Sequence, residues 1–469
     1  MHTTALFNFA PLANVGLMGL VIAMGPISWV WMQSSAPKLD QESISVEEGL
    51  SNKKLRQNRR LLLLSQITLF LTFDLLVFGA YTRLTDSGLG CPDWPGCYGF
   101  TSPNGASLMI DGAQQLMPTG PVTHFKAWVE MIHRYLATAV GVLILTMCLY
   151  AWVNKLTTRL KFASLFLLIW VCTQGAFGAF TVTMKLFPAI VTLHLLGAVV
   201  LLLMLTYFVY LQGSLVKGSV ASMSVRRDRA GLNLQNVELN LSRSSATDPN
   251  LKGLSKTELE HIEHISSLLT YLLPLSPPSP LKHNPYLPLV LGVSIGIVLL
   301  QTLLGGWVST NYAVTACSSF PMCQNSWWPH MNFTDGFELW RPLGMTGAGE
   351  ILNFEALTAI HYTHRLFAYV VILGLVGVGA MLSREERFKK LGYLVWSLIA
   401  LQAITGISNA VFQWPLLSAV MHTGGAACLV VVLSIGFLMS RERASEIACA
   451  CQTPPNVLNV DAQQPKVFS

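Results

Sequence analysis

The chain has 469 residues, of which 52% are hydrophobic and 12% are charged, with a formal net charge of +6. Soluble globular domains carry about 25% charged residues, so this composition excludes an ordinary soluble domain and indicates an integral membrane protein. The basic residues are gathered in a few polar segments between long apolar stretches. The positive charge is therefore a signal of membrane topology, and nucleic acid is not an expected partner.

Nine apolar stretches are long enough to span a hydrocarbon core, which needs about 20 residues. They lie at 12–33, 61–80, 127–152, 161–181, 190–212, 286–308, 355–382, 391–413 and 417–440. The first stretch has no counterpart later in the chain, is too long for a cleaved signal and lacks a basic leader. It is predicted to be an extra N-terminal anchor helix within the segment 1–60.

The basic residues predict which side of the membrane each segment occupies. Segments 34–60, 153–160, 213–285, 383–390 and 441–469, together with Lys161, hold 24 of the 30 Lys and Arg residues. Because basic loops stay on the cytoplasmic side, the amino terminus is expected outside and the carboxyl terminus in the cytoplasm. No transit segment rich in Arg and Ser precedes the first span, which favours a multi-pass protein of the bacterial inner membrane.

An internal repeat divides the remaining eight spans into two units. Short motifs recur at offsets of 226 to 231 residues: Cys91/Cys97 as Cys317/Cys323, His133-Arg134 as His364-Arg365, and Gln174, Gly178 and His194 as Gln402, Gly406 and His422. Each unit has an even number of spans, so both insert the same way up. The predicted fold is all-α, with two parallel, pseudo-symmetric four-helix bundles at 61–212 and 286–440. A polar, proline-broken cytoplasmic linker at 213–285 joins them, and a cytoplasmic tail follows at 441–469.

Two histidines per unit are predicted at similar depth near the outer face of the membrane. His133 and His194 each lie a few residues into a span that runs inward, as do His364 and His422. Two neutral imidazoles in the interior of a bundle suit the axial positions of a haem iron. A lone intramembrane histidine is otherwise explained by an interhelical hydrogen bond or a proton relay, but the duplicated pairs favour haem ligation.

The two units differ three residues before the first histidine, where one has Glu130 and the other has His361. Intramembrane acids are costly and usually functional. Glu130 is therefore a candidate catalytic residue that handles protons or orients a substrate; a structural pairing with Arg134 or Arg83 is the alternative. His361 is expected to be a hydrogen-bonding group, because His364 is the residue that aligns with His133.

The long external loops at 81–126 and 309–354 each carry two cysteines with five residues between them, Cys91/Cys97 and Cys317/Cys323. Thiols outside the membrane meet an oxidising compartment, so each pair is a candidate disulfide. The structural interpretation is a staple across a short loop. The functional alternative is a redox couple or a nucleophilic thiol above the haem site, which makes Cys91 and Cys97 candidate catalytic residues.

Three stretches of the first unit resemble the haem A synthases: residues 79–99 (GAYTRLTDSGLGCPDWPGCYG), 130–134 (EMIHR) and 194–198 (HLLGA). The resemblance covers about 61–212 and 286–440. It implies oxidation of a methyl group of haem O to the formyl group of haem A, which serves cytochrome oxidase. It also implies that His133 and His194 hold the substrate haem, whereas His364 and His422 hold a haem b that passes electrons.

The resemblance further implies that Glu130 is the family's acid near the substrate and that Cys91/Cys97 are its N-terminal pair. Arg134 and Arg365, each directly after a histidine ligand, are included as candidate haem-binding residues. The expected partners are membrane lipid, an electron acceptor, and haem O arriving from the lipid phase or from a haem O synthase. The sequence leaves open whether copies of the chain form a homo-oligomer.

Two other functions are compatible with the same residues. A quinol-linked, b-type electron-transfer protein would hold two permanent haems and no substrate haem. A haem carrier would bind haem without converting it. Haem O or haem A in the extracted pigment separates the synthase from the cytochrome, and loss of conversion on replacing Glu130 separates the synthase from the carrier.

Overall fold

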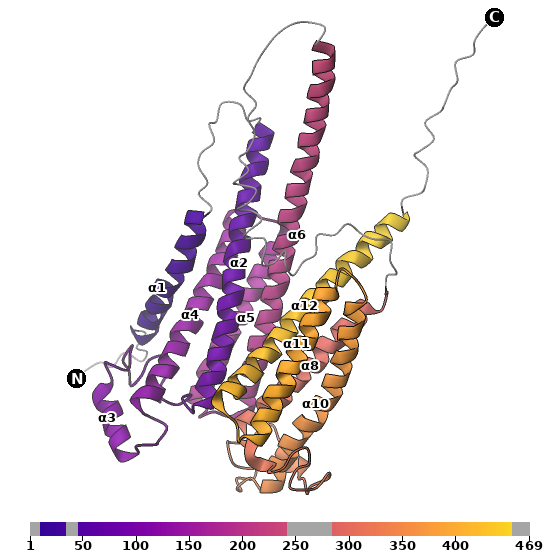
Figure 1. Cartoon of the computed structure of the whole chain (residues 1–469). Helices are drawn as coiled ribbons and strands as arrows, with labels where there is room; N and C mark the ends of the chain where they lie inside the picture. The colour runs from indigo at the N-terminus through magenta and orange to yellow at the C-terminus, as the bar shows by residue number, and fades with distance from the viewer. Residues whose placement is uncertain (1–9, 34–45, 242–283, 453–469) are drawn as a thin grey trace, which may run out of the picture.

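The computed structural model describes residues 10–33, 46–241 and 284–452, and within these ranges every regular element is helical (Figure 1). Nine helices of this described part are long and apolar enough to cross a membrane. One of them is α1 (Ala10–Gln33), which contains the predicted anchor. The prediction of an all-α integral membrane protein with an additional N-terminal helix is therefore confirmed.

The first bundle is a ring of four helices: α2 (Val46–Leu84), α4 (His124–Val153), α5 (Thr158–Thr183) and α6 (Pro188–Leu241). α2 and α5 each pack against both α4 and α6. α4 and α6 therefore lie across one diagonal of the ring, and α2 and α5 across the other. Outside the ring, α1 packs along α4, where Gly19 leaves room for Thr138.

The second bundle repeats this arrangement with α8 (Leu287–Thr310), α10 (Phe354–Ser383), α11 (Lys389–Val411) and α12 (Leu416–Gln452). α8 and α11 each pack against both α10 and α12, so α10 and α12 are again the diagonal pair. The bundles meet where α6 packs against α8 and α12, and where α2 packs against α12. One apolar core cluster crosses this boundary and includes Leu76 and Leu202 of the first bundle with Leu291 and Leu433 of the second.

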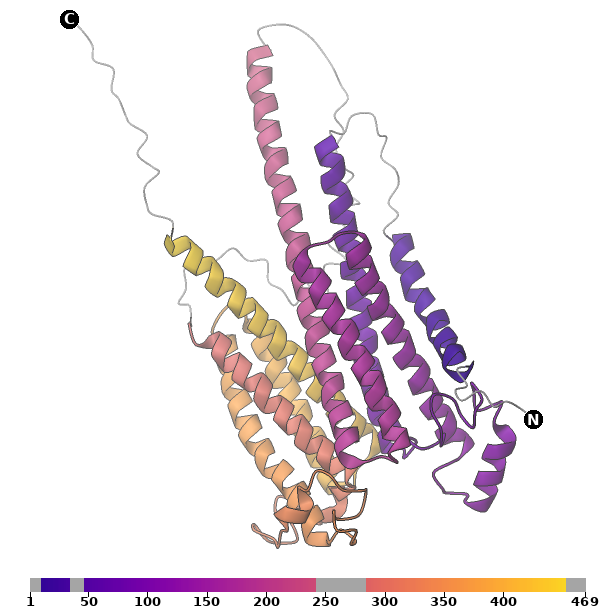
Figure 2. The same cartoon turned by 180° about the vertical axis from the view of Figure 1, so that it is seen from behind.

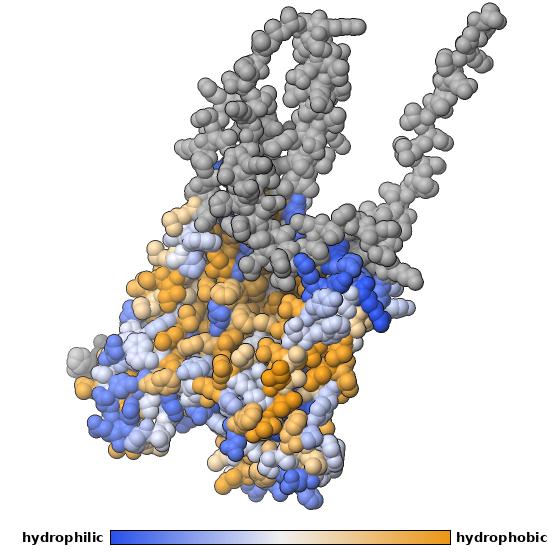
Figure 3. All heavy atoms as spheres, viewed as in Figure 1, coloured by the Kyte–Doolittle hydropathy of each residue, from blue (hydrophilic) through white to orange (hydrophobic). Residues whose placement is uncertain are grey.

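Both long loops lie at the same end of the molecule, here called the loop end (Figures 1 and 2). The loop at 85–123 contains α3 (Ser107–Leu116), and the loop at 311–353 contains η1 (Ala313–Ala316) and α9 (Phe333–Gly336). The two bundles therefore run parallel to each other. Apolar residues cover the middle of the visible face, whereas polar residues gather towards its ends (Figure 3).

Three helices extend beyond the predicted spans: α2 begins at Val46, α6 reaches Leu241 and α12 reaches Gln452. The predicted linker at 213–285 therefore starts as helix, and its part at 242–283 lies outside the described residues. The physical reason is that no proline occurs between Pro188 and Pro249. Once formed, a helix propagates without a new nucleation cost, even through polar sequence.

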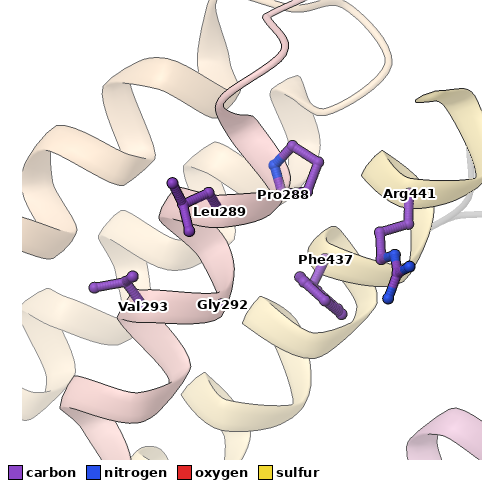
Figure 4. Close-up of a pocket in the computed structure, with 6 residues that line it drawn as sticks. All are labelled: Pro288, Leu289, Gly292, Val293, Phe437 and Arg441. Atoms are coloured by element: carbon purple, nitrogen blue, oxygen red, sulfur yellow. The ribbon is translucent and has the colours of Figure 1, made fainter.

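A groove of about 400 Å³ lies between α8 and α12, at the end opposite the loops (Figure 4). Its lining residues are Pro288, Leu289, Gly292, Val293, Phe437 and Arg441. Gly305, which contacts His364 near the other end of α8, is 13 residues beyond Gly292. At 1.5 Å per residue this is roughly 20 Å along the helix, so the groove is separate from the histidines.

Candidate functional site

The four repeated histidines lie on the diagonal helices of the two bundles. His133 is on α4 and His194 on α6, whereas His364 is on α10 and His422 on α12. Each pair is therefore carried on opposite sides of a ring of helices. The two imidazoles of a pair are close enough for a charge on one to affect the other. All four side chains are half-buried. This arrangement brings together the residues that the sequence predicted as haem ligands.

A glycine on a neighbouring helix faces each of the four imidazoles. A Cβ added to the glycine would lie 2.9 to 3.5 Å from the nearest ring atom; the pairs are Gly79–His133, Gly178–His194, Gly305–His364 and Gly406–His422. Gly79 and Gly305 belong to α2 and α8, which are equivalent helices, and they share the 226-residue offset of the cysteines. The repeat thus keeps bulk away from all four rings, although the repeated motifs found in the sequence included only Gly178 and Gly406.

The ring nitrogens also indicate a missing partner at both sites. His194 Nδ1 and His364 Nδ1 are buried and have no hydrogen-bond partner. Buried polar atoms are almost always paired in folded proteins, so an unpaired one calls for a group that is not a side chain. His422 differs, because its Nδ1 lies 2.9 Å from Thr405 Oγ1. Neutral imidazoles with one free nitrogen are suitable iron ligands.

Two glutamine side chains form hydrogen bonds with the backbone of the second bundle's histidines. Gln301 Nε2 donates to the carbonyl oxygen of His364 at 3.1 Å, and Gln402 Nε2 donates to that of His422 at 3.0 Å. A Cβ on Gly425 would overlap the Gln402 amide, so this glycine makes room for that side chain. The helix turn that carries each ligand is thereby fixed by a neighbouring helix.

His361 has no ring nitrogen left for a metal. Its Nδ1 lies 3.0 Å from the carbonyl oxygen of Ala313, and its Nε2 accepts a hydrogen bond from Arg365 Nε at 3.1 Å. The side chain is 5% exposed. This geometry supports the interpretation of His361 as a hydrogen-bonding group and of His364 as the ligand.

Glu130 occupies the equivalent place in the first bundle and is 4% exposed. Its Oε2 accepts a hydrogen bond from the backbone N–H of Cys91 at 2.8 Å, and its Oε1 is paired with Arg134. The carboxylate thus joins the turn above His133 to the disulfide loop. This position is compatible with both functions considered for Glu130, a reactive acid and a structural partner of Arg134.

Arg134 and Arg365 hold the two cysteine loops by their backbones. Arg134 Nη1 donates to carbonyl oxygens of Asp93, Pro95 and Gly96. In the second bundle, Arg365 Nη1 donates to the carbonyl oxygens of Ser319 at 2.8 Å and Met322 at 3.2 Å. Contact with a haem, the role expected from the sequence, stays a prediction for both arginines. Arg365 Nη2 is nevertheless buried and unpaired, so it has a donor to offer.

Both predicted disulfides are present, Cys91–Cys97 and Cys317–Cys323. All four cysteines are at most 4% exposed. The Asp93 carboxylate also closes the first loop by accepting from the backbone N–H of Tyr98 and of Gly99. Burial limits attack by an external thiol, so the structure favours the staple over the redox couple for the resting loop.

A cluster at the loop end, which the sequence motifs did not reveal, joins the two bundles. Arg83 Nη2 donates to the carbonyl oxygen of Ser309 at 2.6 Å, and its guanidinium lies 4.2 Å from the ring centroid of Tyr312. Tyr312 Oη donates to Asp86 Oδ1 at 2.7 Å. Arg83 and Asp86 lie in the 79–99 stretch on which the sequence resemblance rests, but only the fold shows that they face the other bundle.

Within the described residues, no group of three or more His, Cys, Asp or Glu side chains could hold a bare metal ion. The opposed histidines offer paired imidazoles, a ligand set that suits iron within a porphyrin. The fold and site define a duplicated membrane protein with two parallel helix bundles, each presenting one pair of opposed histidines.

Known proteins resemble this sequence along most of its length. The chain matches the cytochrome oxidase assembly protein family COX15-CtaA over residues 62–236 and 265–434. It is 33% identical to the haem A synthase of Shewanella oneidensis over 372 residues, which cover 79% of this chain and 93% of that protein. The chain belongs to the haem A synthase family.

More distant relatives align over a similar extent. The haem A synthase of Halalkalibacterium halodurans is 22% identical over 379 residues, covering 79% of this chain and 93% of that protein. That of Allorhizobium ampelinum is 23% identical over 396 residues, covering 81% of this chain and 90% of that protein. The similarity thus extends across both bundles.

Proposed function

We propose that the chain is a haem A synthase, an oxidoreductase that converts a methyl group of haem O into the formyl group of haem A. Membership of the family and similarity to a synthase over nearly its full length support this activity. The structural observation that carries the proposal is the duplicated pair of opposed histidines, each faced by a glycine. The quinol-linked cytochrome is not favoured, because the relatives are synthases.

The two bundles are proposed to have different tasks. The first bundle would bind haem O between His133 and His194, because only this half has a carboxylate, Glu130, one helical turn from the first ligand. The second bundle would bind a resident haem b between His364 and His422. The unpaired nitrogens and the glycine-lined rings support a porphyrin in each place.

The residues of the first bundle account for binding, positioning and proton handling. With water as the source of oxygen, conversion of a methyl to a formyl group releases four protons and four electrons. Haem b supplies one-electron redox chemistry when bound. His133 and His194 orient the substrate from opposite sides, and Glu130 Oε1 or Oε2 accepts a proton. Arg134 and the Cys91 N–H keep that carboxylate in place.

The membrane environment completes the proposal. We place the chain in the bacterial inner membrane with the loop end outside and the carboxyl terminus in the cytoplasm, because the described parts of the basic segments lie at the opposite end. Haem O would reach the first bundle from the lipid phase or from a haem O synthase. The electrons would leave through an acceptor outside the chain.

Analysis of the extracted pigment tests the assignment. Protein purified from cells that make haem O should contain haem b together with haem O or haem A. His133→Ala should remove the haem O and haem A fraction and retain haem b, whereas His364→Ala should do the reverse. Haem b alone in the wild-type protein would favour the electron-transfer alternative.

A further inference from the structure

The two cysteine loops are fastened by equivalent arginines, but the groups around these arginines carry different charges. Arg134 and Arg365 occupy the same place in the repeat and both donate to loop carbonyls. At two other equivalent positions the first bundle has a carboxylate and the second does not: Glu130 and Asp93 correspond to His361 and Ser319. In each of these two comparisons the residues have the same structural task in their own bundle, but only the residue of the first bundle is acidic.

In the first bundle the arginine is neutralised. Glu130 is ion-paired with Arg134 and also accepts from Cys91 N–H. Asp93 accepts from the backbone N–H of Gly99 at 2.7 Å. With both carboxylates and the guanidinium ionised, these three groups carry a summed charge of −1.

In the second bundle both carboxylates are replaced by neutral groups. A carbonyl oxygen can only accept and an Arg N–H can only donate, so His361 has its proton on Nδ1 and is neutral. Ser319 Oγ accepts from the backbone N–H of Asn325 at 2.9 Å, as Asp93 does from Gly99. The unit therefore retains the charge of Arg365, which is 8% exposed.

The acids of the second loop do not neutralise Arg365 directly. None of the described acidic side chains forms a salt bridge with it; the pairs within the described residues involve other groups. Asp335 and Glu338 lie near a different buried arginine, Arg341. Glu350 and Glu355 are exposed, so water and salt screen their charges.

From this asymmetry we infer that Arg365, which meets neutral groups at His361 and Ser319 in place of carboxylates, gives the second bundle a higher reduction potential than the first for porphyrins of equal chemistry. Reduction adds an electron to the iron, and a nearby buried positive charge stabilises that added charge. Arg365 directly follows the proposed ligand His364, so the charge lies close to the site. An electron shared between the two bundles would therefore reside mainly on the second.

This inference rests on the proposed function, because it requires a haem in each bundle. It assigns His361, Ser319 and Arg365 to tuning the redox site, a role that does not involve contact with the substrate. The repeat itself supplies the test variants: His361→Glu restores the acid of the first bundle beside Arg365, and Ser319→Asp restores the other acid while keeping an acceptor for Asn325.

The experiment is a spectroelectrochemical titration of purified full-length protein, following the low-spin band that His364→Ala removes. One added charge at roughly 10 Å and an effective dielectric constant of about 20 changes the ratio of reduced to oxidised iron about tenfold. His361→Glu should lower this ratio about tenfold at fixed ambient potential, which corresponds to about 59 mV for one electron. Ser319→Asp adds the same charge at a half-buried position, where water screens it more, so the ratio should fall by a smaller factor of about three.

The matched control is His361→Gln, which replaces the ring with a neutral hydrogen-bonding group. It should leave the midpoint potential close to the wild-type value. A wild-type potential in both His361→Glu and Ser319→Asp, with the band intact, would overturn the inference and leave the proposed function standing. A wild-type spectrum without any band that depends on His364 would overturn the proposed cofactor set and this inference with it.

Discussion

Asp86 and Tyr312 are equivalent residues of the two repeats, yet they contact each other. Their positions differ by 226, the offset that also relates the cysteine pairs, and Tyr312 Oη donates to Asp86 Oδ1 at 2.7 Å. Both have left-handed backbone conformations, with φ of 50° and 54°. The same turn therefore ends α2 and α8, and the pseudo-twofold axis of the molecule passes between these two side chains.

Removing this contact should loosen the junction between the bundles. Tyr312→Phe deletes one hydrogen bond while keeping the ring under Arg83, so we expect a loss of about 1 kcal/mol in stability. Thermal unfolding in detergent measures the effect, with Tyr312→Ala as the more severe variant because it also removes the cation–π contact. Equal unfolding temperatures for wild type and Tyr312→Ala would show that the cluster does not join the bundles.

The same hydroxyl gives a pH dependence. Burial is the main cause that raises the pKa of Tyr312 above its usual value of 10, and the nearby Arg83 partly opposes it. The protonated form is thus favoured in the folded state, so its contribution is complete below pH 10 and is lost as the pH rises through the folded-state pKa. Stability measured between pH 9 and 12 should fall less steeply in Tyr312→Phe than in the wild type.

The glycines that face the histidines should be sensitive to a single methyl group. A Cβ at Gly79 or Gly305 would lie 2.9 Å from a ring atom, whereas at Gly178 it would lie at an ordinary 3.5 Å. Gly79→Ala and Gly305→Ala should therefore lower haem content per polypeptide more than Gly178→Ala. Gly175→Ala is the control, because nothing lies within 4 Å of its added Cβ. Equal haem content in all four variants would contradict this account of the site.

The two neighbouring histidines of α10 should respond differently to replacement. His364→Ala should abolish one low-spin haem spectrum because it removes a proposed ligand. His361→Ala should keep that spectrum, since both His361 nitrogens are already bonded to Ala313 and Arg365. Absorption spectra of the purified reduced proteins decide between them, and the reverse pattern would exchange the two assignments.

Glu130 combines two roles that a pair of substitutions can separate. Glu130→Gln keeps an oxygen to accept from Cys91 N–H but removes the charge, whereas Glu130→Ala removes both. If the carboxylate handles protons, both variants should retain haem O and form little haem A, a loss of at least about 100-fold in conversion. Pigment analysis over time measures this. Full conversion by Glu130→Gln would reduce the role of Glu130 to holding the loop.

The disulfides can be tested by comparing the two loops. Replacing Cys91 and Cys97 together by Ser should cost about 2 kcal/mol of stability if the bond is only a staple, as expected for a short closed loop. The matched double variant of Cys317 and Cys323 should then have a similar effect. Loss of conversion with normal stability and haem content, confined to the first loop, would instead indicate redox participation.

The repeat made much of this fold predictable from the sequence. Matching motifs at a nearly constant offset placed the histidines and identified the cysteine pairs, because ligands and disulfides demand particular residue types. Gly79 and Gly305 were less visible, since glycine serves many purposes in membrane helices and only the packing shows which imidazole each one faces. The interbundle contact of Arg83 with Ser309 likewise depends on how two separate bundles associate.

The arginines show that adjacent residues of a helix can face different surroundings. Adjacent residues of an α-helix project about 100° apart, so Arg134 does not share the direction of His133. It shares a face with Glu130, four residues earlier, and both reach the loop. The length of α6 was also underestimated, because hydropathy marks where a helix leaves an apolar layer and not where its backbone stops being helical.

The fastening of the cysteine loops has a consequence for how the two repeats diverged. Arg134 and Arg365 donate to main-chain oxygens, so these hydrogen bonds do not depend on which side chains the loop residues carry. Mutation can therefore change the charge of such a segment, acidic in one copy and neutral in the other, without breaking these hydrogen bonds. A duplicated scaffold gains in this way the freedom to specialise its two halves while keeping one shape.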